Sequence, residues 1–85
     1  MELNEVLAIT DFAELYILSG EIERGIAFYQ RLQRRASANE WLPYYEGALL
    51  EKLDKFEEAI AAYEKSIELS PKHTNGHASF RIGII

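Results

Sequence analysis

Few residues in this 85-residue chain have the types and spacing that metal chemistry needs. His73 and His77 are four positions apart, a spacing that would align two imidazole ligands if one helix carried both. Residues 72–77 have a polar, turn-like composition with Asn75 and Gly76 between the histidines, so we interpret them as a loop. The sequence therefore predicts two exposed loop histidines and no metal site.

The remaining reactive side chains do not form a catalytic set. The chain has no cysteine, which excludes disulfides, thiol nucleophiles and thiolate metal ligands. It has no glycine-rich phosphate loop and no nucleophile elbow, and most carboxylates have the spacing of a solvated helix face. We therefore expect neither an enzyme nor a bound cofactor.

One dense basic patch is present, at Arg31, Arg34 and Arg35. It could bind an anionic partner. The alternative is that these residues complement the negative end of a helix dipole and keep the surface soluble. We favour the second interpretation, because basic residues are common in the last turns of helices.

Aromatic residues gather on one stripe of a predicted helix, at Trp41, Tyr44 and Tyr45, with Ala48 one turn further on. Trp and Tyr offer a large contact area with few torsions to freeze, so they suit a binding surface. The alternative is that Trp41 and one tyrosine pack inside the fold.

Composition limits the class of protein. The chain is 48% hydrophobic and 27% charged, which is too apolar for disorder and too charged for a membrane protein. We expect no membrane span, because no apolar run approaches about 20 residues. The acidic N-terminus does not resemble a signal peptide, and the lack of cysteine fits a reducing compartment, so we expect a cytoplasmic location. The net charge of -5 argues against nucleic acid as a partner.

Apolar periodicity predicts four amphipathic helices and a shorter apolar segment at the end of the chain. We expect Gly20 to end the first helix, Asn39 to cap the third, and Pro43 to be tolerated in the first turn of the third. The fourth helix should bury Phe56, together with Ala59, Ile60, Tyr63 and Ile67. The predicted helices are 5–18, 22–35, 40–53 and 56–69, and the final segment is 78–85.

The pattern repeats when the chain is shifted by 34 residues. Core positions then keep their small, aromatic or aliphatic character: Ile22 falls on Phe56, Gly25 on Ala59, Ile26 on Ile60 and Tyr29 on Tyr63, while Gly20 falls on the turn residue Asp54. Small residues at Gly25 and Gly47 should mark points where helices cross closely.

Residues 40–73 resemble a tetratricopeptide repeat, a family whose pattern is matched by Gly47, Leu50, Phe56, Ala59, Tyr63, Ser66 and Pro71. Residues 6–39 resemble a degenerate copy, and residues 74–85 resemble the first helix of a third, with two residues inserted. Pro43 and Glu46 depart from the family pattern. The resemblance implies one all-α domain over 1–85: a right-handed α-solenoid of antiparallel helix pairs, with about two and a half repeats and five helices.

The resemblance also implies a concave groove that binds a peptide or protein segment. The groove positions that we expect to bind the partner are Asp11, Glu14, Trp41, Tyr44, Tyr45 and Lys52. Such a groove is acidic and aromatic, so it favours a ligand with basic or apolar anchors. We do not expect the family's clamp for a C-terminal carboxylate, because its Lys and Asn positions hold Thr10, Glu14 and Tyr45.

Both ends of the predicted array leave apolar side chains uncovered. These are Leu7, Leu15 and Leu18 at one end, and Phe80, Ile82, Ile84 and Ile85 at the other. Uncovered apolar patches mark contact surfaces, so the unit either self-associates as a homo-oligomer or is a piece of a longer array. A regulatory segment of a larger protein is a further alternative.

Overall fold

The computed structural model describes residue 13, residues 15–70 and residues 75–84, and these residues confirm the all-α prediction. After a helical stretch that ends at Ser19 come α2 (Ile22–Arg35), α3 (Trp41–Lys52), α4 (Phe56–Leu69) and α5 (Asn75–Ile84). The described residues include no strand. The bounds of α2 and α4 agree with the predicted ranges. The predicted start of the first helix lies outside the described residues.

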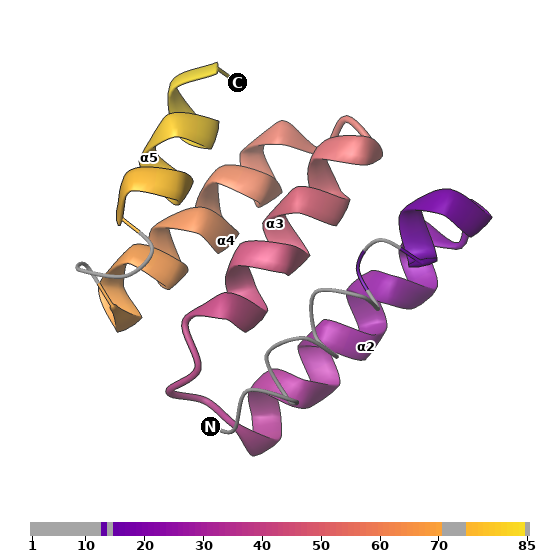
Figure 1. The fold of residues 1–85 in the computed structure, drawn as a ribbon, viewed down its shortest axis with the longest axis horizontal. Coiled ribbons are helices and arrows are strands. Elements are labelled where there is room, and N and C mark those ends of the chain that lie inside the picture. The colour runs from indigo at the N-terminus through magenta and orange to yellow at the C-terminus, as the bar shows by residue number, and fades with distance from the viewer. Residues whose placement is uncertain (1–12, 14, 71–74, 85) are drawn as a thin grey trace.

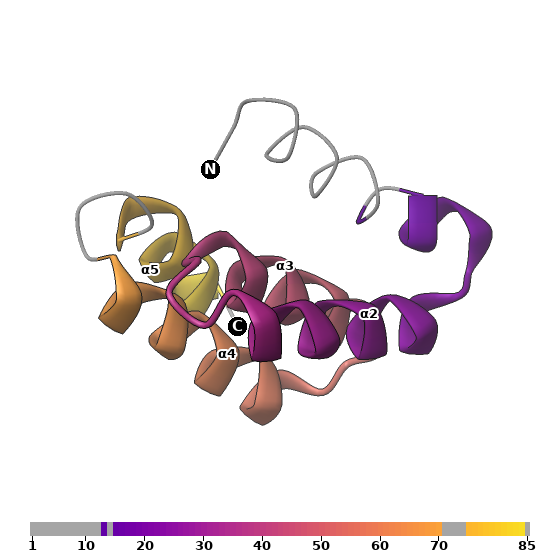
Figure 2. The same cartoon turned by 90° about the horizontal axis from the view of Figure 1, so that it is seen from below.

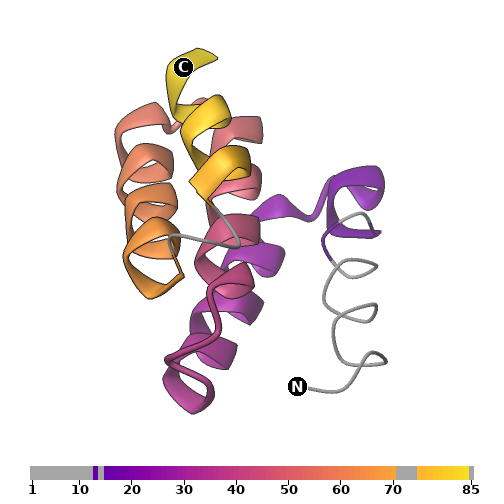
Figure 3. The same cartoon turned by 60° about the vertical axis from the view of Figure 1, so that its left-hand side comes forward.

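Each helix packs against the next one in the sequence. Consecutive helices run in opposite directions and lie side by side from α2 to α5, and α3 and α4 share the most extensive contact (Figure 1). In the view of Figure 2, α3 and α5 both lie above α4. Figure 3 brings α5 to the front, where it stands against α3 and α4. This arrangement is that of a tetratricopeptide-like stack of antiparallel helix pairs.

The helix ends follow the local sequence signals. Gly20 and Asp54 are the equivalent turn residues of the two repeats, and both adopt positive φ, 77° and 58°. Glycine accepts that conformation without strain, and Asp is among the residues that tolerate it. The Asn39 side chain accepts a hydrogen bond from the backbone N–H of Trp41 at 3.0 Å, as expected of a cap. Pro43 is the third residue of α3, where its missing N–H has no intrahelical acceptor.

The core runs between the helices and centres on two fully buried tyrosines, Tyr29 of α2 and Tyr63 of α4. Glycines allow the helices around them to approach closely. A Cβ added at Gly47 would lie 2.9 Å from the Tyr63 ring, and one added at Gly25 would lie 2.9 Å from both Tyr16 and Leu49. The prediction that these glycines mark close helix crossings is therefore confirmed.

Two local predictions are wrong. Phe56 is 44% exposed rather than buried. It is the first residue of α4, and side chains tilt toward the N-terminus of a helix, so its ring extends beyond the packed turns. The second error is the loop at 72–77, because α5 already begins at Asn75. Contacts of α5 with α4 outweigh the weak helix propensity of Asn75 and Gly76.

One side of α5 packs against the core. Ala78 is fully buried there. Ile82 packs partly against the core, so it does not belong to the uncovered set in which the sequence placed it. Phe80 and Ile84 remain exposed, by 65% and 56%.

Candidate protein-binding surface

Three aromatic side chains of α3 meet on one face. Tyr44 and Tyr45 come three and four residues after Trp41. Residues at these spacings lie on the same side of a helix. The Trp41 ring centroid is 5.6 Å from that of Tyr44 and 6.3 Å from that of Tyr45. The two tyrosine rings are 5.3 Å apart, edge to face. All three side chains are partly exposed, so together they form an aromatic surface.

The two tyrosines of this surface also pack inward. Tyr45 stacks on Tyr29 with centroids 5.9 Å apart, and Tyr44 lies 5.6 Å from Tyr63. Both belong to the partly buried shell around the core. Tyr44 and Tyr45 therefore serve both the exposed surface and the packing of the core. Trp41 is not among the residues of that shell.

Burial raises the pKa of three tyrosine hydroxyls in and below the aromatic surface. It raises the pKa of Tyr29 and Tyr63 well above the ordinary value, and in Tyr63 the hydrogen bond to Glu51 adds to the rise. Burial also raises the pKa of Tyr44, with a further contribution from Tyr45. Tyr29, Tyr44 and Tyr63 therefore carry no tyrosinate charge at physiological pH.

An ion pair that the sequence did not predict joins α3 to α5 beside the aromatic surface. Arg81 donates to both carboxylate oxygens of Glu51, with Nε 3.0 Å from Oε1 and a second bond from Nη2 to Oε2. Tyr63 donates to Glu51 Oε1 at 2.5 Å. The Glu51 side chain is 10% exposed. Burial alone would raise its pKa, but the bonds from Arg81 and Tyr63 outweigh burial and lower it. Arg81 thus offsets the negative charge that Glu51 brings to this side of α3.

A second polar network joins α2, α3 and α4 and explains the unusual Glu46. Gln33 donates to Glu46 Oε1 at 2.7 Å, and Gln30 donates to Oε2 at 3.1 Å. Lys65 donates to Gln33 Oε1 at 3.2 Å, and the Gln33 amide also donates to the Tyr29 carbonyl at 3.2 Å. Gln33 is buried, so it needs these partners. From the sequence, a glutamine on the buried side of α2 indicates that a polar partner is needed. Comparison of the repeats cannot show that this partner is Glu46.

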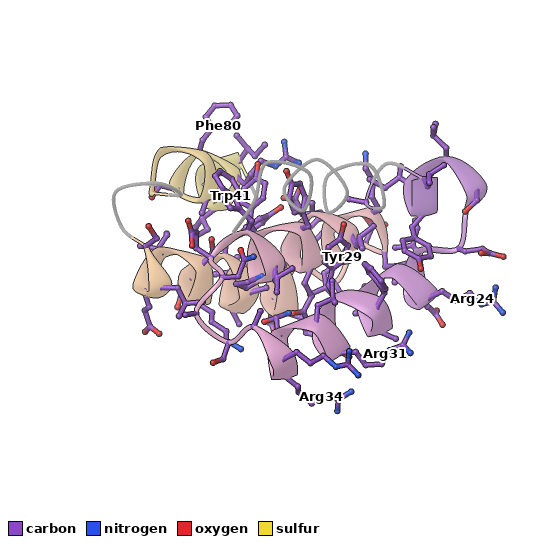
Figure 4. All side chains as sticks on the ribbon, turned by 60° about the horizontal axis from the view of Figure 1, so that its bottom comes forward. Arg24, Tyr29, Arg31, Arg34, Trp41 and Phe80 are labelled. Atoms are coloured by element: carbon purple, nitrogen blue, oxygen red, sulfur yellow. The ribbon has the colours of Figure 1, made fainter. Side chains whose placement is uncertain are left out.

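The structure places four of the six predicted groove residues. Trp41, Tyr44 and Tyr45 come together, and Lys52 is exposed at the last turn of α3. Asp11 and Glu14 lie outside the described residues, so the acidic side of the predicted groove does too. Figure 4 shows Phe80 on the same side of the helices as Trp41, which adds an exposed apolar side chain of α5 to this face. We call the partly exposed rings of Trp41, Tyr44, Tyr45 and Phe80 the aromatic face.

The described residues contain no group of three or more His, Cys, Asp or Glu side chains placed to hold a metal ion. The His77 backbone lies within α5, and His73 is outside the described residues. None of the described helices is both long and apolar enough to span a membrane.

Stacked antiparallel helix pairs, with small residues at the crossings and a 34-residue period, define an α-helical repeat protein. Residues 44–73 match the family model of the tetratricopeptide repeat, over most of α3 and all of α4. The resemblance to the tetratricopeptide repeat that the sequence predicted is therefore confirmed for this part of the chain. Neither a curated protein nor a solved structure matches the chain significantly.

Proposed function

We propose that the chain is a protein-interaction module that binds a polypeptide segment on its aromatic face. The tetratricopeptide repeat is in general an interaction repeat, which supports the class of function. The observation that carries the proposal is the gathering of three partly exposed aromatic rings at the start of α3. Buried aromatic anchors contribute much of the binding energy at protein interfaces.

The chemistry of this face favours a ligand with apolar or aromatic anchors. Glu51 is already paired with Arg81, so it gives little attraction to a basic ligand. Preference for Lys or Arg in the ligand would have to come from Asp11 and Glu14. We therefore expect the main anchor to pack on Trp41, with Phe80 as an adjacent apolar contact.

The experiment uses Trp41, the one tryptophan of the chain, as its reporter. Peptides selected from a displayed random library against the intact chain should change the Trp41 fluorescence on titration. Calorimetry then compares wild type with Trp41→Ala, which keeps a good helix former at the first position of α3. We expect at least about tenfold weaker binding, as for an interface anchor.

Glu57→Lys on the exposed face of α4 is the matched control, and it should bind as wild type does. Trp41→Ala is preferable to replacing Tyr44 and Tyr45, since both tyrosines also support the core. Equal affinity of wild type and Trp41→Ala for every selected peptide would contradict the proposal.

Self-association is a second candidate function, favoured by the exposed apolar residues near the two ends of the described chain. Leu15 and Leu18 are 58% and 76% exposed, and Phe80 and Ile84 are 65% and 56% exposed. Sedimentation at low micromolar concentration should then show a species larger than the monomer, and Phe80→Ser with Ile84→Ser should shift it to monomer. A wild-type protein that is monomeric throughout would exclude this candidate.

A further inference from the structure

The outer surface of α2 carries a hollow with basic walls. It has a volume of about 420 Å³ and is lined by Phe28, Arg31, Leu32, Arg34 and Arg35. We call these five residues the α2 basic surface. Figure 4 shows Arg31 and Arg34 projecting away from the helices on the side opposite Trp41 and Phe80. This surface is therefore separate from the aromatic face.

The three arginines of the α2 basic surface are not used within the described fold. Arg24 pairs with Glu21 at 3.4 Å, and Arg81 pairs with Glu51. Among the described residues, no carboxylate lies within ion-pair distance of Arg31, Arg34 or Arg35, which are all exposed. With respect to the described carboxylates, the three guanidinium groups thus keep their capacity for charged hydrogen bonds.

Helix-dipole complementation accounts for only part of this patch. It explains Arg34 and Arg35, which lie in the last turn of α2, but not Arg31 in the turn before. The carbonyl end of a helix carries about half a negative charge, well below the three positive charges present. Glu46 lines a neighbouring hollow together with Arg34, but its two oxygens accept hydrogen bonds from Gln33 and Gln30.

We propose that the α2 basic surface docks an acidic peptide segment of a protein partner. The carboxylates of the segment pair with Arg31, Arg34 and Arg35, and one apolar or aromatic side chain enters the hollow between Phe28 and Leu32. Arginine suits this role because its planar fork binds carboxylates with two parallel hydrogen bonds. The half-buried Phe28 and Leu32 provide the apolar wall.

The apolar wall of the hollow favours a peptide over nucleic acid. The net charge of -5 repels any polyanion at long range, so the side chain that enters between Phe28 and Leu32 decides the occupant. A short acidic segment with one apolar anchor needs only the local positive field and the hollow. This docking goes beyond the function proposed for the aromatic face and does not depend on it.

The test is fluorescence anisotropy on the intact chain with defined probes. The first probe is a labelled peptide of about ten residues, rich in Asp and Glu with one central Phe, long enough to cover a site of this kind. The second probe replaces that Phe by Ser, and the third is a single-stranded oligonucleotide. Arg31→Gln with Arg34→Gln is compared with Arg24→Gln with Lys55→Gln, which removes the same charge at exposed sites elsewhere.

We expect the Phe-containing peptide to bind wild type, and to bind about tenfold more weakly to the Arg31/Arg34 variant, as the loss of two exposed ion pairs predicts. The Arg24/Lys55 variant should change binding by less than about twofold. Binding should weaken in salt and when Ser replaces Phe in the peptide. Trp41→Ala should leave it unchanged, so failure here and failure of the aromatic-face proposal are distinguishable.

Several results would overturn the proposal. These are absence of peptide binding, an equal loss of peptide affinity in the Arg31/Arg34 and Arg24/Lys55 variants, equal affinity for the Phe and Ser peptides, or tighter binding of the oligonucleotide. A further one is self-association of the unliganded chain that disappears in the Arg31/Arg34 variant, because the occupant would then be a second copy.

Discussion

At the scale of single residues, three glycines differ in the reason why a side chain would be tolerated or not. One is constrained by backbone conformation, one by packing, and one by neither. Gly20 has φ 77° and room for a Cβ, a Cβ added at Gly47 would lie 2.9 Å from the Tyr63 ring, and Gly83 of α5 has neither constraint. Tyr63 cannot withdraw easily, because its hydroxyl is bonded to Glu51. The same substitution to alanine therefore probes a different physical effect at each position.

We expect Gly47→Ala to destabilise the fold by about 1–3 kcal/mol through overpacking. Gly20→Ala should cost about 1–2 kcal/mol through the left-handed backbone alone. Gly83→Ala should be neutral or stabilise by up to about 1 kcal/mol, since alanine has the higher helix propensity. Urea unfolding followed by circular dichroism measures all three. A loss at Gly83 as large as that at Gly47 would contradict this assignment.

At the scale of elements, the local features of this chain could be predicted from sequence better than its polar contacts. The ranges of α2 and α4, the Asn39 cap and the positive φ of Gly20 all follow from residue types over a few neighbouring positions. The bonds of Arg81 to Glu51 and of Gln33 to Glu46 depend on which turns face each other. A repeat alignment does not contain that information, because it compares small, apolar and aromatic positions and not the polar residues between them.

For the candidate site too, the sequence predicted which residues share a face but not how deeply they are buried. The helical spacing of Trp41, Tyr44 and Tyr45 predicted that their rings would share a face, and they do. It could not show that Tyr44 and Tyr45 also pack on Tyr63 and Tyr29, because that depends on the depth at which α3 sits. The start of α5 was missed for the same reason, since tertiary contacts hold Asn75 and Gly76 in a helix that their propensity disfavours.

The attachment of α5 should depend on pH through Glu51. The pKa of Glu51 is lowered in the fold, so its ionised form adds stability that is fully present above the ordinary carboxyl pKa of 4.5. That stability is lost as the pH falls through the lowered folded value. We expect Glu51→Gln to remove about 1–2 kcal/mol at pH 7, typical of hydrogen bonds to a charged group.

The measurement is urea unfolding of wild type and Glu51→Gln from pH 7 downward. The difference in stability between them should shrink below pH 4.5. Glu57→Gln, an exposed change of the same charge on α4, serves as the control. A difference that stays constant down to the lowest pH reached would show that the Glu51 charge does not stabilise the fold.

At the scale of the whole molecule, the helices form a chain of neighbour contacts with a strong centre. Contact is most extensive between α3 and α4, less between α2 and α3, and least between α4 and α5. In a repeat array, stability is approximately a sum over such neighbouring interfaces. Two polar networks reinforce the stack: one ties α2, α3 and α4 through Gln33, and the other ties α3, α4 and α5 through Glu51.

This distribution predicts the order in which parts of the molecule open. Amide hydrogen exchange should be slowest in α3 and α4 and fastest in α5 among the four helices, because local opening requires only the weaker interface to break.

Arg81→Met keeps an unbranched side chain but removes the bonds to Glu51, so it should accelerate exchange in α5 several-fold while α3 and α4 change less. Arg24→Met, which breaks only an exposed pair with Glu21, should leave α5 unchanged. Uniform acceleration of all four helices by Arg81→Met would instead show that α5 opens only with the whole stack.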